Sequence, residues 1–157
     1  MKSKWKKAFM RCAFAFSECS SAERLKVGCI IVKDNKIISV GYNGTPNGWN
    51  NNCEIEEKTD DGEIILKTKP NVIHAESNCL IKLAKTTGNA NKALMFITHS
   101  PCYECAKMIY QSGIKKVYYA NDYRNMDGVD FLKSCNVKIK KTLAGTAPFV
   151  VLDKLSF

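Results

Sequence analysis

Two short segments carry residue types and spacings suited to a metal-dependent catalytic site. His74 and Glu76 stand two apart in the first segment, and Cys102 and Cys105 stand three apart in the second, directly after Pro101. One imidazole and two thiolates supply three of the four ligands that zinc takes, which leaves one position open for water. A structural zinc site closes its shell with four protein ligands. This set therefore favours a catalytic metal, with Glu76 unliganded beside the open position.

The pattern His-x-Glu followed by Pro-Cys-x-x-Cys is typical of zinc-dependent nucleobase deaminases. Zinc lowers the pKa of a water molecule toward neutrality, and a carboxylate outside the ligand shell can accept the proton. We expect Glu76 to carry one proton to N3 of a cytosine and another to the departing amine. The sequence therefore predicts a hydrolytic deamination.

Each part of the pattern has a simpler interpretation when it is taken alone. A Cys-x-x-Cys pair also occurs in redox sites and in half of a structural zinc site, and a single histidine commonly satisfies a hydrogen bond in the core. The combination with Pro101 and a strand-like run at 94–98 favours the catalytic interpretation. A non-enzymatic, zinc-stabilised nucleic-acid binder is the alternative from a different class, and Glu76 argues against it.

Two helices are expected to carry these residues. Asn71–Lys85 follows Pro70, has apolar side chains at helical spacing and ends before Gly88, which predicts a helix with His74 and Glu76 in its first turn.

The second helix is expected to begin with Ser100 as N-cap and Pro101 as its first residue, which places Cys102 and Cys105 on one face. The starts of the two helices would then meet at one metal, where free N–H groups favour thiolates.

The other patterns predict an α/β fold in a single domain of residues 1–157. Strand-like runs lie at 27–32, 36–40, 94–98, 116–120 and 137–140. The first two flank a short polar turn and predict a β-hairpin, whereas a short helix at 129–135 favours a parallel pair of the last two. We expect a three-layer α/β/α fold, a five-stranded mixed sheet with helices on both faces.

Charge and composition restrict the environment of the chain. It has 157 residues, a net charge of +9 and eight cysteines, and no apolar run approaches the roughly 20 residues that cross a bilayer. We expect a cytoplasmic protein without a membrane partner. A basic amphipathic helix at the N-terminus is best explained by a solvated outer face, with nucleic-acid or membrane contact as alternatives. Residues 50–71 are acidic and predict a surface insertion that a polyanion would avoid.

Four segments resemble the deoxycytidylate (dCMP) deaminases of the cytidine deaminase superfamily. They are the Gly-Tyr-Asn-Gly-x-Pro-x-Gly loop at 41–48, the zinc segment at 74–78, the cysteine segment at 100–107 and the segment at 111–114. The resemblance covers residues 19–136 and implies hydrolysis of dCMP to dUMP and ammonia, which supplies dUMP for thymidylate synthesis. If the source is viral, the resemblance implies that the protein acts in the cytoplasm of the host cell.

The resemblance also implies roles in nucleotide binding. Asn43 would hydrogen-bond the deoxyribose or the base edge, and the main chain of Ala75 would help to read the pyrimidine. Tyr123 would pack on the nucleotide, and Arg124 would bind its phosphate, with Arg24 as a weaker candidate for the same region. Asn43 could instead cap a turn, and Arg24 could be a surface residue.

Family members commonly form homohexamers that dCTP with Mg²⁺ activates and dTTP inhibits. The resemblance places that effector site at Tyr42, Gly44 and Asn47. Cys19 and Cys53 resemble two ligands of a second, structural zinc found in some members, and further ligands are not evident.

Two alternatives for the substrate stay open. A bifunctional dCMP/dCTP deaminase belongs to the same family, whereas a tRNA adenosine deaminase shares the metal ligands. The tRNA enzymes typically lack the long insertion between Asn43 and His74, so a nucleic-acid partner is not expected.

Cys79 replaces the alanine usual in the family and is expected to pack in the helix core.

Overall fold

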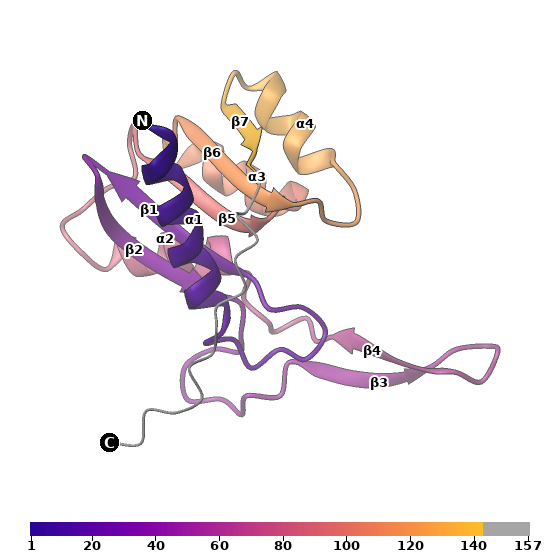
Figure 1. Ribbon diagram of the computed structural model, residues 1–157. Coiled ribbons are helices and arrows are strands. Elements are labelled where there is room, and N and C mark those ends of the chain that lie inside the picture. The colour runs from indigo at the N-terminus through magenta and orange to yellow at the C-terminus, as the bar shows by residue number, and fades with distance from the viewer. Residues whose placement is uncertain (143–157) are drawn as a thin grey trace.

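A five-stranded sheet forms the centre of the molecule, with helices on both faces (Figure 1). The structure is a computed structural model that describes residues 1–142; residues 143–157 of the expected domain lie outside the described part. The elements are α1 (Ser3–Ser17), β1 (Gly28–Lys33), β2 (Lys36–Tyr42), β3 (Glu54–Lys58), β4 (Ile64–Thr68), α2 (Ala75–Ala84), β5 (Leu94–His99), α3 (Tyr103–Gln111), β6 (Lys116–Asn121), α4 (Asp127–Ser134) and β7 (Lys138–Lys141).

The central strands are apolar on both faces because each face packs against helices. In β1, Cys29 and Ile31 belong to the cluster that α2, α3 and α4 cover, whereas Ile30 and Val32 belong to the cluster under α1. Side chains alternate along a strand, so this division follows from their positions. The expected three-layer α/β/α fold is confirmed. None of the helices within residues 1–142 combines the length and apolar character needed to span a bilayer.

The strand order β2-β1-β5-β6-β7 is mixed, as predicted. β1 pairs antiparallel with β2 and β5, while β5, β6 and β7 are parallel. Asp34 and Asn35 have φ values of 50° and 60° and make the tight turn between β1 and β2. The parallel strands need crossover helices, α3 and α4, which lie on the same side of the sheet as α2.

Both ligand-bearing helices begin later than the sequence predicts. α2 starts at Ala75 rather than Asn71, since the N–H and C=O of Ile73 pair with Gly44 in an isolated β-bridge. His74 therefore occupies the N-cap position, and only Glu76 lies in the first turn.

The start of α3 is displaced in the same way. The predicted N-cap, Ser100, donates its N–H to the carbonyl of Asn121 and accepts a hydrogen bond from the N–H of Tyr123, so it is tied to the end of β6. Cys102 takes the N-cap position of α3. The expectation that Pro101 is the first helical residue is wrong, yet both cysteines remain at the start of the helix.

The insertion at 50–71 contains two strands that the sequence patterns did not reveal. β3 and β4 pair only with each other and form a hairpin arm that projects from the body of the molecule (Figure 1). At its base, the buried carboxylate of Glu54 accepts hydrogen bonds from the N–H groups of Glu23 and Arg24, at 3.2 and 3.3 Å. Only the outer part of the insertion is therefore a surface feature.

The close packing of α2 on the sheet depends on Gly41 of β2. A Cβ atom at this position would lie 2.3 Å from the carbonyl oxygen of Ala75 and 2.5 Å from the nitrogen of Cys79. Next to this contact, the hydroxyl of Ser39 donates to the carbonyl of Cys79 at 2.7 Å. A side chain at position 41 would push the helix that carries Glu76 away from the sheet.

We expect Gly41→Ala to lower the free energy of unfolding by about 1–3 kcal/mol, as overpacking usually does. Gly44→Ala is the matched control because nothing lies within 4 Å of its added Cβ, and it should change stability by less than about 0.5 kcal/mol. Urea unfolding followed by circular dichroism measures both. Equal midpoints for the two variants would contradict the proposed contact.

Candidate metal centre and active site

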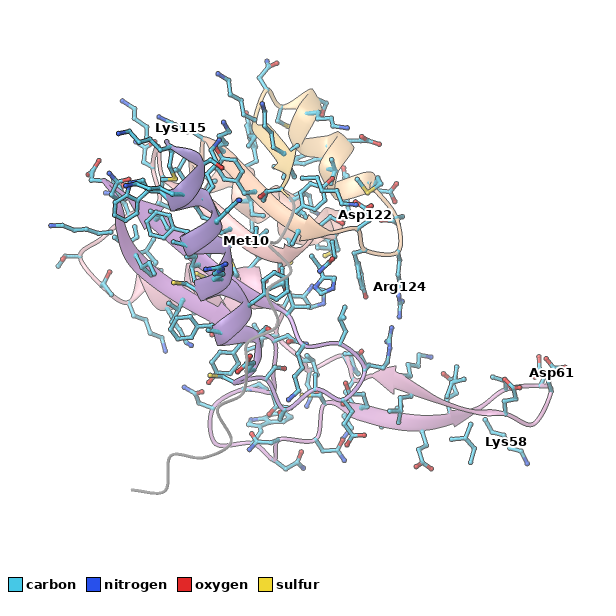
Figure 2. All side chains as sticks on the ribbon, viewed as in Figure 1. Met10, Lys58, Asp61, Lys115, Asp122 and Arg124 are labelled. Atoms are coloured by element: carbon cyan, nitrogen blue, oxygen red, sulfur yellow. The ribbon has the colours of Figure 1, made fainter. Side chains whose placement is uncertain are left out.

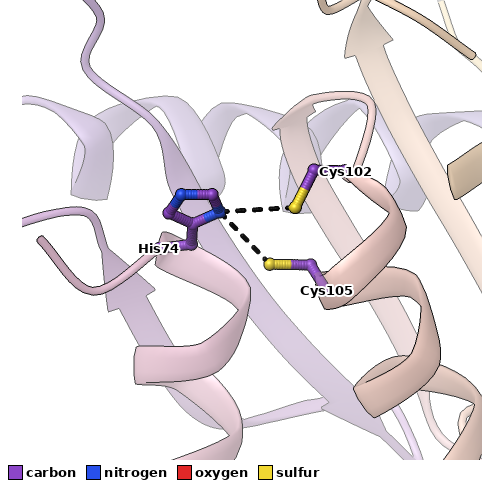
Figure 3. Close-up of side chains that lie close together, drawn as sticks. All are labelled: His74, Cys102 and Cys105. Atoms are coloured by element: carbon purple, nitrogen blue, oxygen red, sulfur yellow. Dashed lines mark hydrogen bonds between the residues drawn. The ribbon is translucent and has the colours of Figure 1, made fainter. Parts of the chain in front are cut away.

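His74, Cys102 and Cys105 converge from the starts of α2 and α3 (Figure 3). Nδ1 of His74 lies 3.5 Å from Sγ of Cys102 and 3.4 Å from Sγ of Cys105. Within residues 1–142 this is the one group of three or more potential ligands whose donor atoms lie within 4.8 Å of one another. The predicted ligand set is therefore assembled by the fold.

The spacing of these atoms fits tetrahedral zinc. Bonds of about 2.3 Å to sulfur and 2.0 Å to nitrogen at the tetrahedral angle place the two atoms about 3.5 Å apart. The nitrogen–sulfur distances of 3.5 and 3.4 Å agree with that value. Nδ1 is the imidazole atom that faces both sulfurs, so it is the nitrogen that would bind the metal.

The thiols are arranged so that one of them ionises readily. A hydrogen bond from Cys105, followed by one from His74, lowers the pKa of Cys102 to about 4. The same contact with Cys102, together with burial, raises the pKa of Cys105. The hydrogen bond to Cys102 raises the pKa of His74. In the metal-free protein, one thiolate is thus stabilised by two donors, and metal binding would release their protons.

Glu76 meets the requirements for a proton carrier. Its side chain is 5% exposed, and burial raises its pKa to about 7 in the metal-free protein. A carboxyl group with a pKa near the working pH can both accept and donate a proton. Glu76 lines the same cavity as His74 and Cys102 and belongs to no ligand group within the described residues.

The cavity above the ligands has a volume of about 60 Å³ and brings together most of the predicted nucleotide-binding residues. Its lining includes Arg24, Asn43, Ala75 and Tyr123 in addition to His74, Glu76 and Cys102. Arg124 is not part of the lining. Its guanidinium lies 5.6 Å from the ring centre of Tyr123, and the side chain extends from the loop after β6 on the side toward the hairpin arm (Figure 2).

Asn43 holds the loop that forms one wall of the cavity. Its Oδ1 accepts a hydrogen bond from the N–H of Val27, and its Nδ2 donates to the carbonyl of Leu25, both at 2.8 Å. An asparagine amide has one more N–H and one more lone pair to offer. Asn43 therefore braces its own loop and keeps capacity for a ligand.

Arg24 is fixed by the base of the hairpin arm. Its Nη1 donates to Oγ1 of Thr68 at 3.0 Å, and its main-chain N–H donates to Glu54. Thr68 also lines the cavity. The sequence patterns missed the positioning roles of Glu54 and Thr68. Both residues contact Arg24, which lies 30 and 44 positions away from them in the sequence, and local patterns do not report such distant contacts.

His99 is a further residue of the cavity that the sequence analysis left without a role there. The hydroxyl oxygen of buried Thr98 accepts a hydrogen bond from the N–H of Gly28 and lies 3.1 Å from Nδ1 of His99. Either the Thr98 hydroxyl or the Nδ1–H group of His99 is the donor in this contact, depending on the tautomer of the ring. Burial lowers the pKa of His99, which keeps the ring neutral.

A second cavity, of about 580 Å³, lies on the other side of the Asn43 loop. Tyr42, Gly44 and Asn47 line it, together with Lys82 of α2 and Lys85, the C-cap residue of that helix. The residues predicted for effector binding are therefore neighbours in space.

Cys19 and Cys53, the candidates for a second zinc, belong to no potential ligand group within residues 1–142. The thiol of buried Cys53 lies 3.4 Å from Oγ of Ser21 instead, and Cys19 is exposed.

The chain is similar to known proteins in sequence and in fold. Residues 3–121 match the model of the cytidine and deoxycytidylate deaminase zinc-binding region. Human deoxycytidylate deaminase is 36% identical over 78% of this chain and 68% of its own length. ComE operon protein 2 of Bacillus subtilis is 36% identical over 76% of this chain, which spans 61% of that relative. The crystal structure of dCMP deaminase from cyanophage S-TIM5 in complex with dCMP and dUMP has a TM-score of 0.82 and 45% identity, covering 90% of this chain and 99% of that one.

The electrostatics of the ligand group predict selective alkylation of Cys102 in the metal-free protein. Because its pKa is lowered to about 4, Cys102 is a thiolate throughout the range of about pH 5.5 to 7.5. Its reaction with iodoacetamide, measured by peptide mass spectrometry, should therefore change little with pH in that range, and zinc should protect it. Half-buried Cys135 serves as the internal control that zinc leaves unchanged. A Cys102 rate that rises about tenfold per pH unit would contradict this assignment.

Proposed function

The chain belongs to the cytidine and deoxycytidylate deaminase family, and from that premise we propose that it hydrolyses dCMP to dUMP and ammonia. The observation that carries the proposal is the buried carboxylate of Glu76, with a pKa raised to about 7, beside three zinc ligands that leave one coordination position open. The adjoining cavity is lined by Arg24, Asn43 and Tyr123, which are expected to bind the nucleotide. The similar cyanophage enzyme holds dCMP and dUMP, which supports the choice of substrate.

Zinc held by His74, Cys102 and Cys105 would act as the Lewis acid that activates a water molecule. Glu76 accepts a proton from that water and transfers it to N3 of the cytosine ring as the water oxygen bonds to C4. It then carries the second proton to the amine at C4 as the C–N bond breaks, so that water and dCMP become dUMP and ammonia. Burial of Glu76 keeps bulk water from competing for these protons.

The phosphate is proposed to lie between Arg124 and Arg24. A guanidinium offers two parallel N–H groups that match a phosphate monoester. Arg24 is held in the cavity wall through Thr68, whereas Arg124 is exposed beside Tyr123 and free to approach a ligand. This arrangement supports a nucleotide as the substrate over a free nucleoside.

We further propose that the second cavity binds the effectors, dCTP with Mg²⁺ as activator and dTTP as inhibitor, in a homohexamer. Nζ of Lys82 lies 4.8 Å from the ring centre of Tyr42, and Lys85 is the C-cap residue of α2, so two cations are available for phosphates. The side chain of Asn78 donates to the carbonyl of Tyr42 at 2.8 Å. A ligand there would act on α2, the helix that also carries Glu76.

Replacement of the proton carrier tests the mechanism. Glu76→Gln should still fold and bind one zinc, because the ligands are untouched, but its turnover of dCMP should fall at least about 10²–10⁴-fold. Metal analysis and ammonia release measure the two properties. A variant that keeps near-normal turnover would remove Glu76 from the reaction.

Removal of the exposed guanidinium tests substrate binding. Arg124→Ala should lower kcat/KM for dCMP by about tenfold or more and leave deoxycytidine, which has no phosphate, nearly unaffected. Lys138→Ala, which removes an exposed cation of β7, is the matched control. An equal loss of kcat/KM on the two substrates would indicate a structural role for Arg124 and no phosphate contact.

The effector proposal predicts that dCTP with Mg²⁺ raises the initial rate at a dCMP concentration below KM. The double change Lys82→Ala and Lys85→Ala should abolish this stimulation and leave the basal rate within about twofold, since neither side chain lines the substrate cavity. Lys36→Ala, an exposed lysine outside both cavities, should respond normally. Stimulation that survives the double change would place the effector elsewhere.

A further inference from the structure

The hairpin arm, residues 54–68, lacks a partner within the described part of the chain. Its strands pair with each other, and no helix or other strand of residues 1–142 packs on it extensively. An isolated two-stranded hairpin is marginally stable in water. In addition, four large apolar side chains of the arm are exposed to solvent, and Ile64 has the largest exposed fraction of them, 68%. They are Ile55, Ile64, Ile65 and Leu66.

The arm is also opposite in charge to the rest of the protein. It carries six acidic and two basic side chains, so the remaining residues hold 22 basic and 9 acidic ones. Glu57 pairs with Lys67 across the hairpin. Glu56, Asp60 and Asp61 form no ion pair within residues 1–142, although all three are exposed. An apolar arm with free acidic groups fits a basic surface that also presents an apolar side chain.

The outer face of α1 is such a surface. Lys4, Lys7 and Arg11 are exposed on it without an ion pair in the described chain, and Trp5, 42% exposed, stands among them. No acidic residue occupies the first turn of α1. The inner face is buried through Phe9 and its neighbours, so the outer face is the one left for a partner.

These two surfaces cannot meet within one copy. The arm projects away from the sheet and from α1 (Figure 1), and its tip at Asp61 points outward into solvent (Figure 2). We propose that the hairpin arm of one copy docks on the outer face of α1 of a second copy. Such a contact joins two different surfaces, so two copies can exchange it reciprocally about a two-fold axis, or it can repeat around a closed ring. It builds on the proposed self-association and is independent of the proposed reaction.

Substitutions that reverse the charges of the arm and of α1 test the contact directly. Sedimentation velocity over a range of protein concentrations gives the dissociation constant of the zinc-loaded full chain. Glu56→Lys with Asp60→Lys should weaken association by about tenfold or more, and so should Lys4→Glu with Lys7→Glu. The chain with all four changes should regain most of the association, because opposite charges again face each other. Lys138→Glu with Lys140→Glu, which makes the same charge change on β7, is the matched control and should associate normally.

Circular dichroism and zinc content establish that each variant is folded. A wild-type chain that stays monomeric, double variants that associate normally, or four changes that fail to restore association would each overturn the proposal. If the Lys4 and Lys7 changes abolish binding of a single-stranded oligonucleotide and leave the assembly intact, α1 is a nucleic-acid surface instead. Deamination is measured separately on the same samples. Its loss in an assembled variant bears on the proposed reaction and leaves the contact standing.

Discussion

The site depends on one constraint: the starts of two helices must hold three donor atoms within a few ångströms of one point. His74 and Cys102 are N-cap residues, so their positions are set by how α2 and α3 sit on the sheet. Gly41 lets α2 approach β2 closely, and the bridge from Gly44 to Ile73 determines where that helix begins. A shift of either helix would separate Nδ1 of His74 from the sulfur atoms of Cys102 and Cys105, even with every residue of the site unchanged.

Local patterns predicted the sheet and the ligand set because short continuous apolar runs and short-range spacings determine them. The helix starts were wrong because long-range main-chain hydrogen bonds override local capping signals, as they do at Ile73 and Ser100. The hairpin arm escaped prediction since its strands are exposed and lack the alternation of apolar and polar residues that marks a half-buried strand. The support of Arg24 by Glu54 and Thr68 joins residues 30 and 44 positions apart, which no local pattern reports.

Helix α2 connects the separate parts of the proposed function. Its first turn carries Glu76 at the substrate cavity, Asn78 contacts Tyr42 at the second cavity, and Lys82 reaches the same cavity one turn later. The base of the hairpin arm holds another wall of the substrate cavity through Arg24. The proposed effector binding and the proposed self-association would therefore both act on the geometry around the zinc ligands without contacting the metal.

The most direct measurement is ammonia release by the purified, zinc-loaded protein given dCMP, dCTP, deoxycytidine or a tRNA anticodon stem-loop. The buried Glu76 beside three metal ligands, with two arginines proposed to bind a phosphate monoester, predicts efficient turnover of dCMP and little of the other three. Turnover confined to the stem-loop would contradict the account and make nucleic acid the substrate. Absence of turnover on all four would contradict it as well, and would favour a structural role for the zinc site.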